Sequence, residues 1–137
     1  MPIPNPTDRV QTAIQAMPLA PRARVLEIRA LIFEAANSVG VSPLVETLKW
    51  GQPSYLPSPR SAGTTIRLGW SDKSPDVVGL YVHCQTNLVS RYRDLYGDAL
   101  SYDGNRGVLF SIKVDLPKTA LLQMAGMALT YHRQKRS

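Results

Sequence analysis

The segment KWGQPSY, residues 49–55, constrains the fold of this chain more than any other stretch. Glycine weakens a helix, and proline lacks the N–H that an interior helical turn requires. A regular helix therefore cannot run through Gly51 and Pro53. Trp50 and Tyr55 flank these residues with large rings. The segment is predicted to be a turn or a strand end that its two rings hold in place.

The length and composition indicate one domain that covers residues 1–137. A chain of 137 residues with 44% hydrophobic and 19% charged residues can close a single core. No apolar run approaches the roughly 18 residues that span a bilayer, and the N-terminus lacks the pattern of a secretory signal. The single cysteine, Cys84, excludes an internal disulfide and is typical of a reducing compartment. We therefore expect a cytoplasmic protein with no membrane partner.

Apolar residues at spacings of three and four predict helices towards both ends of the chain. The two N-terminal helices are expected over residues 8–17 and 21–38. A helix inserted between strands is expected over residues 87–96, where Asn87 can cap its first turn. The C-terminal helix is expected to begin at Pro117.

Between these helices the hydrophobic pattern changes to a period of two, which predicts strands. Alternation is clear over residues 66–70, 77–83 and 108–114, and a short strand is expected over residues 100–102. Residues 41–49 are ambiguous, because Ser42-Pro43 could begin one helical turn whereas residues 45–50 could equally be an extended edge.

Helices and strands in this arrangement predict an α+β fold. We expect a curved antiparallel sheet of about five strands, packed with two N-terminal helices, one inserted helix and a C-terminal helix. Asp103-Gly104 predicts a hairpin turn within this sheet.

Four motifs occur in the order of a known family: residues 49–55, the strand GLYVH at 79–83, the hairpin YDGNR at 102–106 and the helix ALTYH at 128–132. In these motifs the chain resembles the YdhG-like family of small bacterial proteins, a domain of unknown function. The resemblance extends from about Val25 onward. It implies helices packed on a curved antiparallel sheet.

Some relatives in that family are labelled frataxin-like iron chaperones. The label implies an iron-binding role and a carboxylate-rich surface, because iron ions prefer hard oxygen ligands where thiolates are lacking. This chain has only 10 acidic residues, and they are widely spaced. We therefore assign no metal-binding residue and no cofactor, and the iron role stays an alternative.

A formal charge of +6 makes nucleic acid a second alternative partner. Arg22, Arg24 and Arg29 share one predicted helix, with Glu27 and Glu34 on the same helix, and most other cations are spread thinly. No nucleic-acid-binding motif accompanies the charge. Binding of nucleic acid through dispersed arginines is therefore not the leading hypothesis.

The aromatic bend is the first candidate part of a binding site, because pockets favour rigid rings beside a few polar groups. A simpler interpretation, which we favour from sequence, is that the rings only anchor the turn. Cations and hydroxyls on three predicted strands are the second part, because arginine binds carboxylates and phosphates in a bidentate manner. Here too the simpler interpretation is an ordinary solvated face. The predicted ligand-binding residues are Lys49, Trp50, Gln52, Pro53, Tyr55, Arg67, Tyr81, His83, Arg106 and Lys113.

No catalytic residue is assigned. One cysteine and two histidines do not give a zinc-binding spacing. His83 and Cys84 are neighbours in a predicted strand, so their side chains should point to opposite faces. A nucleophile pair between Cys84 and a histidine stays an alternative, but no third orienting residue is identifiable. We expect a non-catalytic domain that binds a small anionic ligand or a protein segment between residues 50–55 and the sheet.

Overall fold

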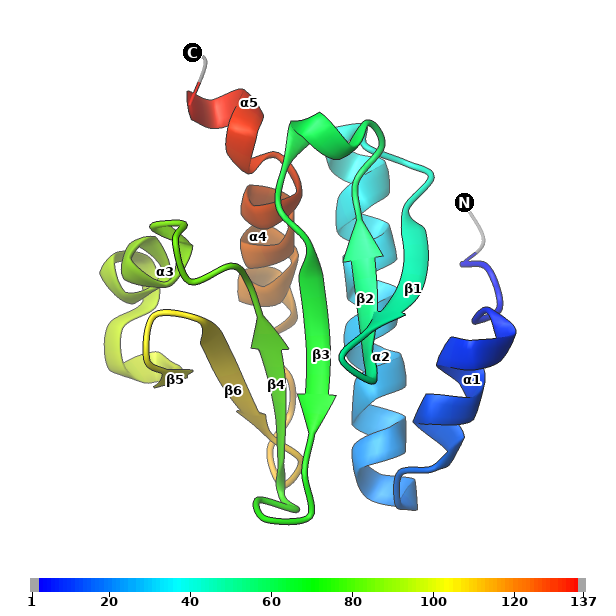
Figure 1. Cartoon of the computed structure of the whole chain (residues 1–137). Coiled ribbons are helices and arrows are strands. Elements are labelled where there is room, and N and C mark those ends of the chain that lie inside the picture. The colour runs from blue at the N-terminus through cyan, green and yellow to red at the C-terminus, as the bar shows by residue number, and fades with distance from the viewer. Residues whose placement is uncertain (1–2, 136–137) are drawn as a thin grey trace.

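A computed structural model of the chain describes residues 3–135 (Figure 1), so the first two and last two residues of the predicted domain lie outside this description. Within these residues the helices are α1 (Asp8–Gln15), α2 (Leu19–Val39), α3 (Leu88–Tyr96), α4 (Lys118–Leu129) and α5 (Tyr131–Lys135). The strands are β1 (Val45–Lys49), β2 (Gln52–Leu56), β3 (Ile66–Trp70), β4 (Val77–Tyr81), β5 (Ser101–Asp103) and β6 (Gly107–Ser111). Two 3-10 turns, η1 (Arg60–Ala62) and η2 (Gly97–Ala99), complete the described elements.

The predicted α+β class is confirmed, with one strand more than expected. The strands form an open antiparallel sheet in the order β1-β2-β3-β4-β6-β5. The ambiguous residues 41–49 contain β1, and β2 begins inside the aromatic bend. A proline interrupts a strand because it cannot donate to the ladder. Pro53 is tolerated in β2 because the pairing of β2 with β3 starts only at Ser54.

The helices cover one face of the sheet and leave the other open (Figure 1). α2 and α4 pack against each other behind the sheet, α1 contacts β1 and β2, and α3 packs beside α4. The opposite face is free of helices in the described part of the chain. Within that part, no helix combines the length and apolar character needed to cross a bilayer.

The core lies between the sheet and the helices. Most strand residues on this side are buried, as are the α2 residues that face them. These include Ile66, Leu68, Val78, Leu80 and Val108 from the strands, and Ile28 and Ile32 from α2. Because successive strand residues point to opposite faces, the residues between them lie on the open face.

Hydrogen-bonded register places one row of residues across the open face. Thr47 pairs with Ser54, Ser54 with Arg67, and Arg67 with Tyr81. Tyr81 pairs in turn with Gly107, and Gly107 pairs with Asp103. The row therefore crosses all six strands and brings residues from distant parts of the sequence side by side.

On the helix side, one buried ion pair joins α2 to β1. Arg29 donates hydrogen bonds to both carboxylate oxygens of Glu46, at 2.7 and 3.0 Å, and each side chain is only 5% exposed. The backbone N–H of Thr7 donates to the same carboxylate at 3.2 Å. The guanidinium of Arg29 also lies 4.6 Å from the ring centre of Phe33. This cluster fastens the start of α1 to the rest of the domain.

Candidate functional site

The centre of the open face is the ring of Tyr81, which lies down on three glycines. A Cβ atom built on Gly69, Gly79 or Gly107 would come within 2.5 to 2.9 Å of atoms of that ring. Such distances are too short for real side chains, so the ring occupies the space above three neighbouring strands that any other residue would fill. The glycines therefore set the position of Tyr81.

Two arginines flank this ring. The guanidinium carbon of Arg67 lies 5.9 Å from the ring centre of Tyr81, and that of Arg106 lies 5.6 Å from it. Burial and the positive charge of Arg106 lower the pKa of Arg67. Arg67 donates a 2.7 Å hydrogen bond to Gln52, a neutral amide. Arg106 is 60% exposed and pairs with Asp103 at 3.1 Å.

Trp50 stands at the side of this group, in the turn between β1 and β2. Lys49 pairs with Gln52, so Trp50 and Gly51 form a two-residue turn, with φ angles of 52° and 74°. The indole is 86% exposed, although it is one of the largest apolar side chains in the protein. Arg67 holds its guanidinium carbon 4.9 Å from the indole ring centre. Trp50, Arg67 and Tyr81 thus form a continuous group of planar side chains.

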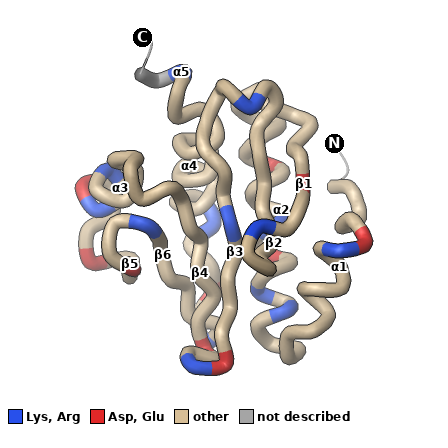
Figure 2. Tube along the Cα trace, in the orientation of Figure 1, with Lys and Arg blue, Asp and Glu red and all other residues tan. Residues whose placement is uncertain are grey.

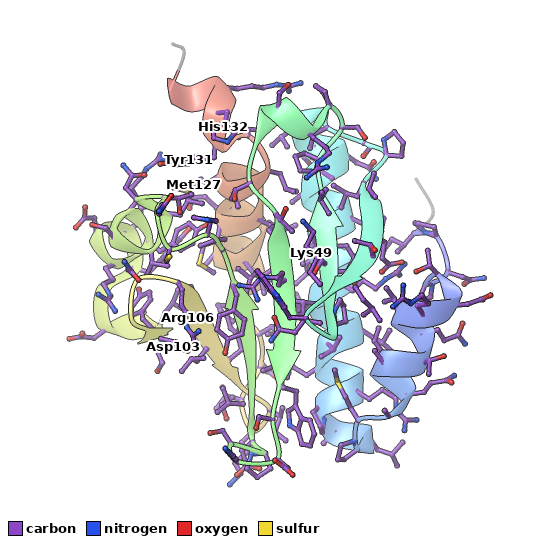
Figure 3. The ribbon with its side chains drawn as sticks, viewed as in Figure 1. Lys49, Asp103, Arg106, Met127, Tyr131 and His132 are labelled. Carbon is purple, nitrogen blue, oxygen red and sulfur yellow. The ribbon has the colours of Figure 1, made fainter. Side chains whose placement is uncertain are left out.

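Trp50 and Arg67 line a pocket of about 310 Å³ beside the start of β3 and the end of β4. Its lining includes Lys49, Arg67 and Arg106, and no Asp or Glu of residues 3–135 contributes to it. The elements that supply these cations, the β1–β2 turn, β3 and the β5–β6 turn, each carry a basic segment at a similar level of the sheet (Figure 2). Lys49 and Arg106 reach this face from opposite sides of the two central strands (Figure 3). Three cations with one carboxylate nearby make the pocket electropositive.

A second pocket of about 240 Å³ lies on the other side of Tyr81. It is lined by Gln52, Gly69, Tyr81 and Asp103, together with serines of the β3–β4 turn, and no Lys or Arg of the described chain lines it. The positive charge of the open face is therefore concentrated on one side of Tyr81.

Seven of the ten predicted site residues lie on this open face. Lys49, Trp50, Arg67, His83 and Arg106 line the larger pocket, and Gln52 and Tyr81 line the smaller one. The sheet register brings them together, whereas their role in binding stays a prediction.

The other three predicted site residues lie elsewhere. Tyr55 is fully buried on the helix side, where it packs edge-to-face against Phe33 at 5.8 Å between ring centres. Pro53 is buried beside it in β2, and Lys113 pairs with Asp76 at 3.2 Å near the β3–β4 turn. The bend that holds Trp50 and Tyr55 is itself a hairpin of the sheet, so the pocket lies beside it and not underneath it.

His83 and Cys84 both line the larger pocket, although alternation in a strand predicted opposite faces for them. The reason is that β4 ends at Tyr81, so neither residue is in a strand. The ring Nδ1 atom of His83 accepts a hydrogen bond from the backbone N–H of Gln85 at 3.1 Å, and Cys84 is exposed. Within residues 3–135, no three His, Cys, Asp or Glu side chains gather closely enough to hold a metal ion.

Sequence reasoning missed the glycines beneath Tyr81, the two threonines Thr64 and Thr65 that line the larger pocket, and the partner Asp103. A glycine inside a strand signals the close approach of another group. Gly69 and Gly79 each occupy an outward position of an alternating strand pattern, where a side chain is usual, and this signal was available in the sequence.

Known proteins offer no guide to the ligand of this site. A scan against protein-family models, a search of curated proteins and a search of solved structures each found no match to this chain. The resemblance to the YdhG-like family therefore stays a prediction.

Proposed function

We propose that this domain binds a small anionic molecule, without catalysis, in the larger pocket of the open face. The observation that supports the proposal is the set of three cations around this pocket, with no carboxylate of the described residues in its lining. Arg67 supports it further, because its charge is partly buried and its polar partner is a neutral amide.

The pocket has the chemistry that anion recognition requires. Guanidinium groups offer several N–H donors in a fixed plane, which suits the two oxygens of a carboxylate or phosphate. Arg67 uses one terminal nitrogen for Gln52, and Arg106 uses one for Asp103. Each arginine therefore keeps other donors for a ligand. A bound anion would also reduce the repulsion that lowers the pKa of Arg67.

Binding of inorganic phosphate and of acetate, measured by calorimetry and thermal shift at constant ionic strength, tests the proposal. Arg67→Met and Arg106→Met should each weaken binding about tenfold or more, because one charge-assisted hydrogen bond contributes about 1.5–3 kcal/mol. Lys118→Met removes the same charge from an exposed position on α4, behind the sheet, and should leave binding unchanged. The proposal fails if neither anion binds, or if the arginine variants bind as well as the parent protein.

Single-stranded nucleic acid is a second candidate ligand of the same face. Proteins that bind it combine cations with aromatic side chains on which bases stack, and Trp50 and Tyr81 lie beside Arg67 in this way. Three phosphate contacts would give a slope of about −2 for log K against log salt. Fluorescence anisotropy with a labelled oligonucleotide measures that slope. A salt-independent signal, or none, rejects this candidate.

A further inference from the structure

The turn residue Trp50 combines two unfavourable features. Both turn positions have positive φ, a conformation in which Asn-Gly is the preferred sequence. A bulky L-residue is disfavoured there by contact between its Cβ and the following carbonyl. The indole also gains little from burial, because Trp50 is 86% exposed. Strained residues of this kind tend to occur at functional sites.

The exposed ring is nevertheless held in a defined place. Arg67 stacks on the indole at 4.9 Å and is itself fixed by its hydrogen bond to Gln52. Trp50 also borders the larger pocket, where the only other ring in the described lining is the smaller imidazole of His83. The ring is therefore presented next to the cations and remains largely open to solvent.

From this arrangement we infer that Trp50 is a stacking surface for a planar ring in the ligand. The ligand class is then a small aromatic carboxylate or phosphate, whose anionic group is bound by Arg67 and Arg106. This inference rests on the proposed function and narrows it. A pocket of about 310 Å³ is at the small end of ligand sites, which suits a molecule with one or two rings.

Two matched pairs of anions test the inference: inorganic phosphate with phenyl phosphate, and acetate with benzoate. The aromatic member of a pair should bind about tenfold more tightly, the order expected when one ring stacks on an aromatic side chain. The pair that shows the larger gain identifies the anionic group as phosphate or carboxylate. Trp70→Phe removes the other tryptophan, so that quenching of the remaining fluorescence reports stacking on Trp50 directly.

Trp50→Asn is the decisive variant, because asparagine suits the turn and the protein should fold. It should abolish the preference for the aromatic anions, whereas the affinity for phosphate or acetate should fall much less, by the loss of the contact between Arg67 and the indole alone. Trp50→Phe, which keeps a ring, should retain part of the preference. Together these results would support the inference.

Other outcomes overturn it in distinguishable ways. If aromatic and non-aromatic anions bind equally to the parent protein, the proposed function stands and the stacking role is wrong. If Trp50→Asn still prefers the aromatic anions, the ring of the ligand does not stack on Trp50. If no anion binds, the proposed function fails and this inference fails with it. An oligonucleotide that binds at least tenfold more tightly than phenyl phosphate would replace the small ligand with nucleic acid.

Discussion

Arg29 and Arg67 lie on opposite sides of the same sheet, and each holds its guanidinium over an aromatic ring, of Phe33 and Trp50 respectively. Their partners differ. Arg29 forms a buried pair with the carboxylate of Glu46. Arg67 has the neutral amide of Gln52 and a second cation, Arg106, in its surroundings. The charge of Arg29 is therefore neutralised by a carboxylate of the same chain, whereas the charge of Arg67 is not.

The pKa of each arginine reflects this difference. Burial disfavours the charged form of Arg29, yet the hydrogen bond and negative charge of Glu46 raise its pKa. Burial also disfavours the charged form of Arg67, and Arg106 lowers its pKa further. Both guanidinium groups lose solvent, yet the pKa of Arg29 is raised and the pKa of Arg67 is lowered. We infer that Arg29 stabilises the fold, whereas Arg67 serves binding.

The largest effect is expected when Glu46, the partner of Arg29 on the helix side of the sheet, is removed. Glu46→Ala leaves the Arg29 charge buried and uncompensated, so we expect a loss of about 3–5 kcal/mol in the free energy of unfolding. Urea denaturation measures it.

Two further variants control this result. Glu27→Ala removes a carboxylate that is 51% exposed and 3.8 Å from Arg24, so it should cost less than about 1 kcal/mol. The double variant Arg29→Met, Glu46→Leu should recover much of the lost stability, because it leaves no unpaired charge. If Glu46→Ala is no worse than Glu27→Ala, the pair does not stabilise the fold.

A methyl group beneath Tyr81 tests how the open face is built. In Gly79→Ala the new Cβ would lie 2.5 Å from the Tyr81 ring, so the ring has to move. We expect a loss of about 1–3 kcal/mol, the usual range for overpacking. Binding of inorganic phosphate should weaken as well, since the arginines flank that ring.

The same substitution made in a Tyr81→Ala background is the control for this test. Once the ring is absent, Gly79→Ala should cost much less, and a double-mutant cycle measures the difference. Equal costs with and without the ring would show that the glycine is needed for the strand alone.

A substitution in the β1–β2 turn should increase stability, in contrast to the two losses above. Trp50→Asn is expected to stabilise the protein by about 0.5–1 kcal/mol, because asparagine adopts positive φ more readily than tryptophan. Trp50→Ala removes the ring but keeps a disfavoured residue in the turn, so it should give less gain. Urea denaturation compares the two variants. A loss of stability in Trp50→Asn would show that the indole contributes to the fold.

Local sequence patterns were sufficient to predict most of the fold. The spacing of apolar residues predicted α1, α2 and α4, the possible cap at Asn87 predicted α3, and Asp103-Gly104 predicted the hairpin between β5 and β6. Residues 41–49 were ambiguous because a short segment fits both a helical and a strand period. The expected C-terminal helix is interrupted at Thr130, where its hydroxyl donates to the carbonyl of Gly126.

The candidate site was harder to predict, because it depends on which residues of different strands lie opposite each other. The two rings of the bend looked equivalent in sequence, yet alternation buries Tyr55, and the two-residue turn exposes Trp50. Arg29 looked like one of several surface arginines, because its partner Glu46 lies 17 residues away on β1. Alternation and turn geometry set the register within a hairpin, but the order of the strands and the contact of Arg29 with Glu46 depend on the packed structure.

The smallest change in stability is expected for Arg67, the counterpart of Arg29 on the open face. Arg67→Met should change the free energy of unfolding by less than about 0.5 kcal/mol, the usual size for a surface substitution. Lost contacts with Gln52 and Trp50 are offset by relief from the repulsion of Arg106. That repulsion is screened by salt, whose Debye length falls from about 30 Å at 0.01 M to about 3 Å at 1 M. Salt should therefore stabilise the parent protein more than Arg67→Met, as urea denaturation at the two concentrations can measure. A loss of several kcal/mol in Arg67→Met would make this arginine structural, like Arg29, and would remove the contrast between the two faces.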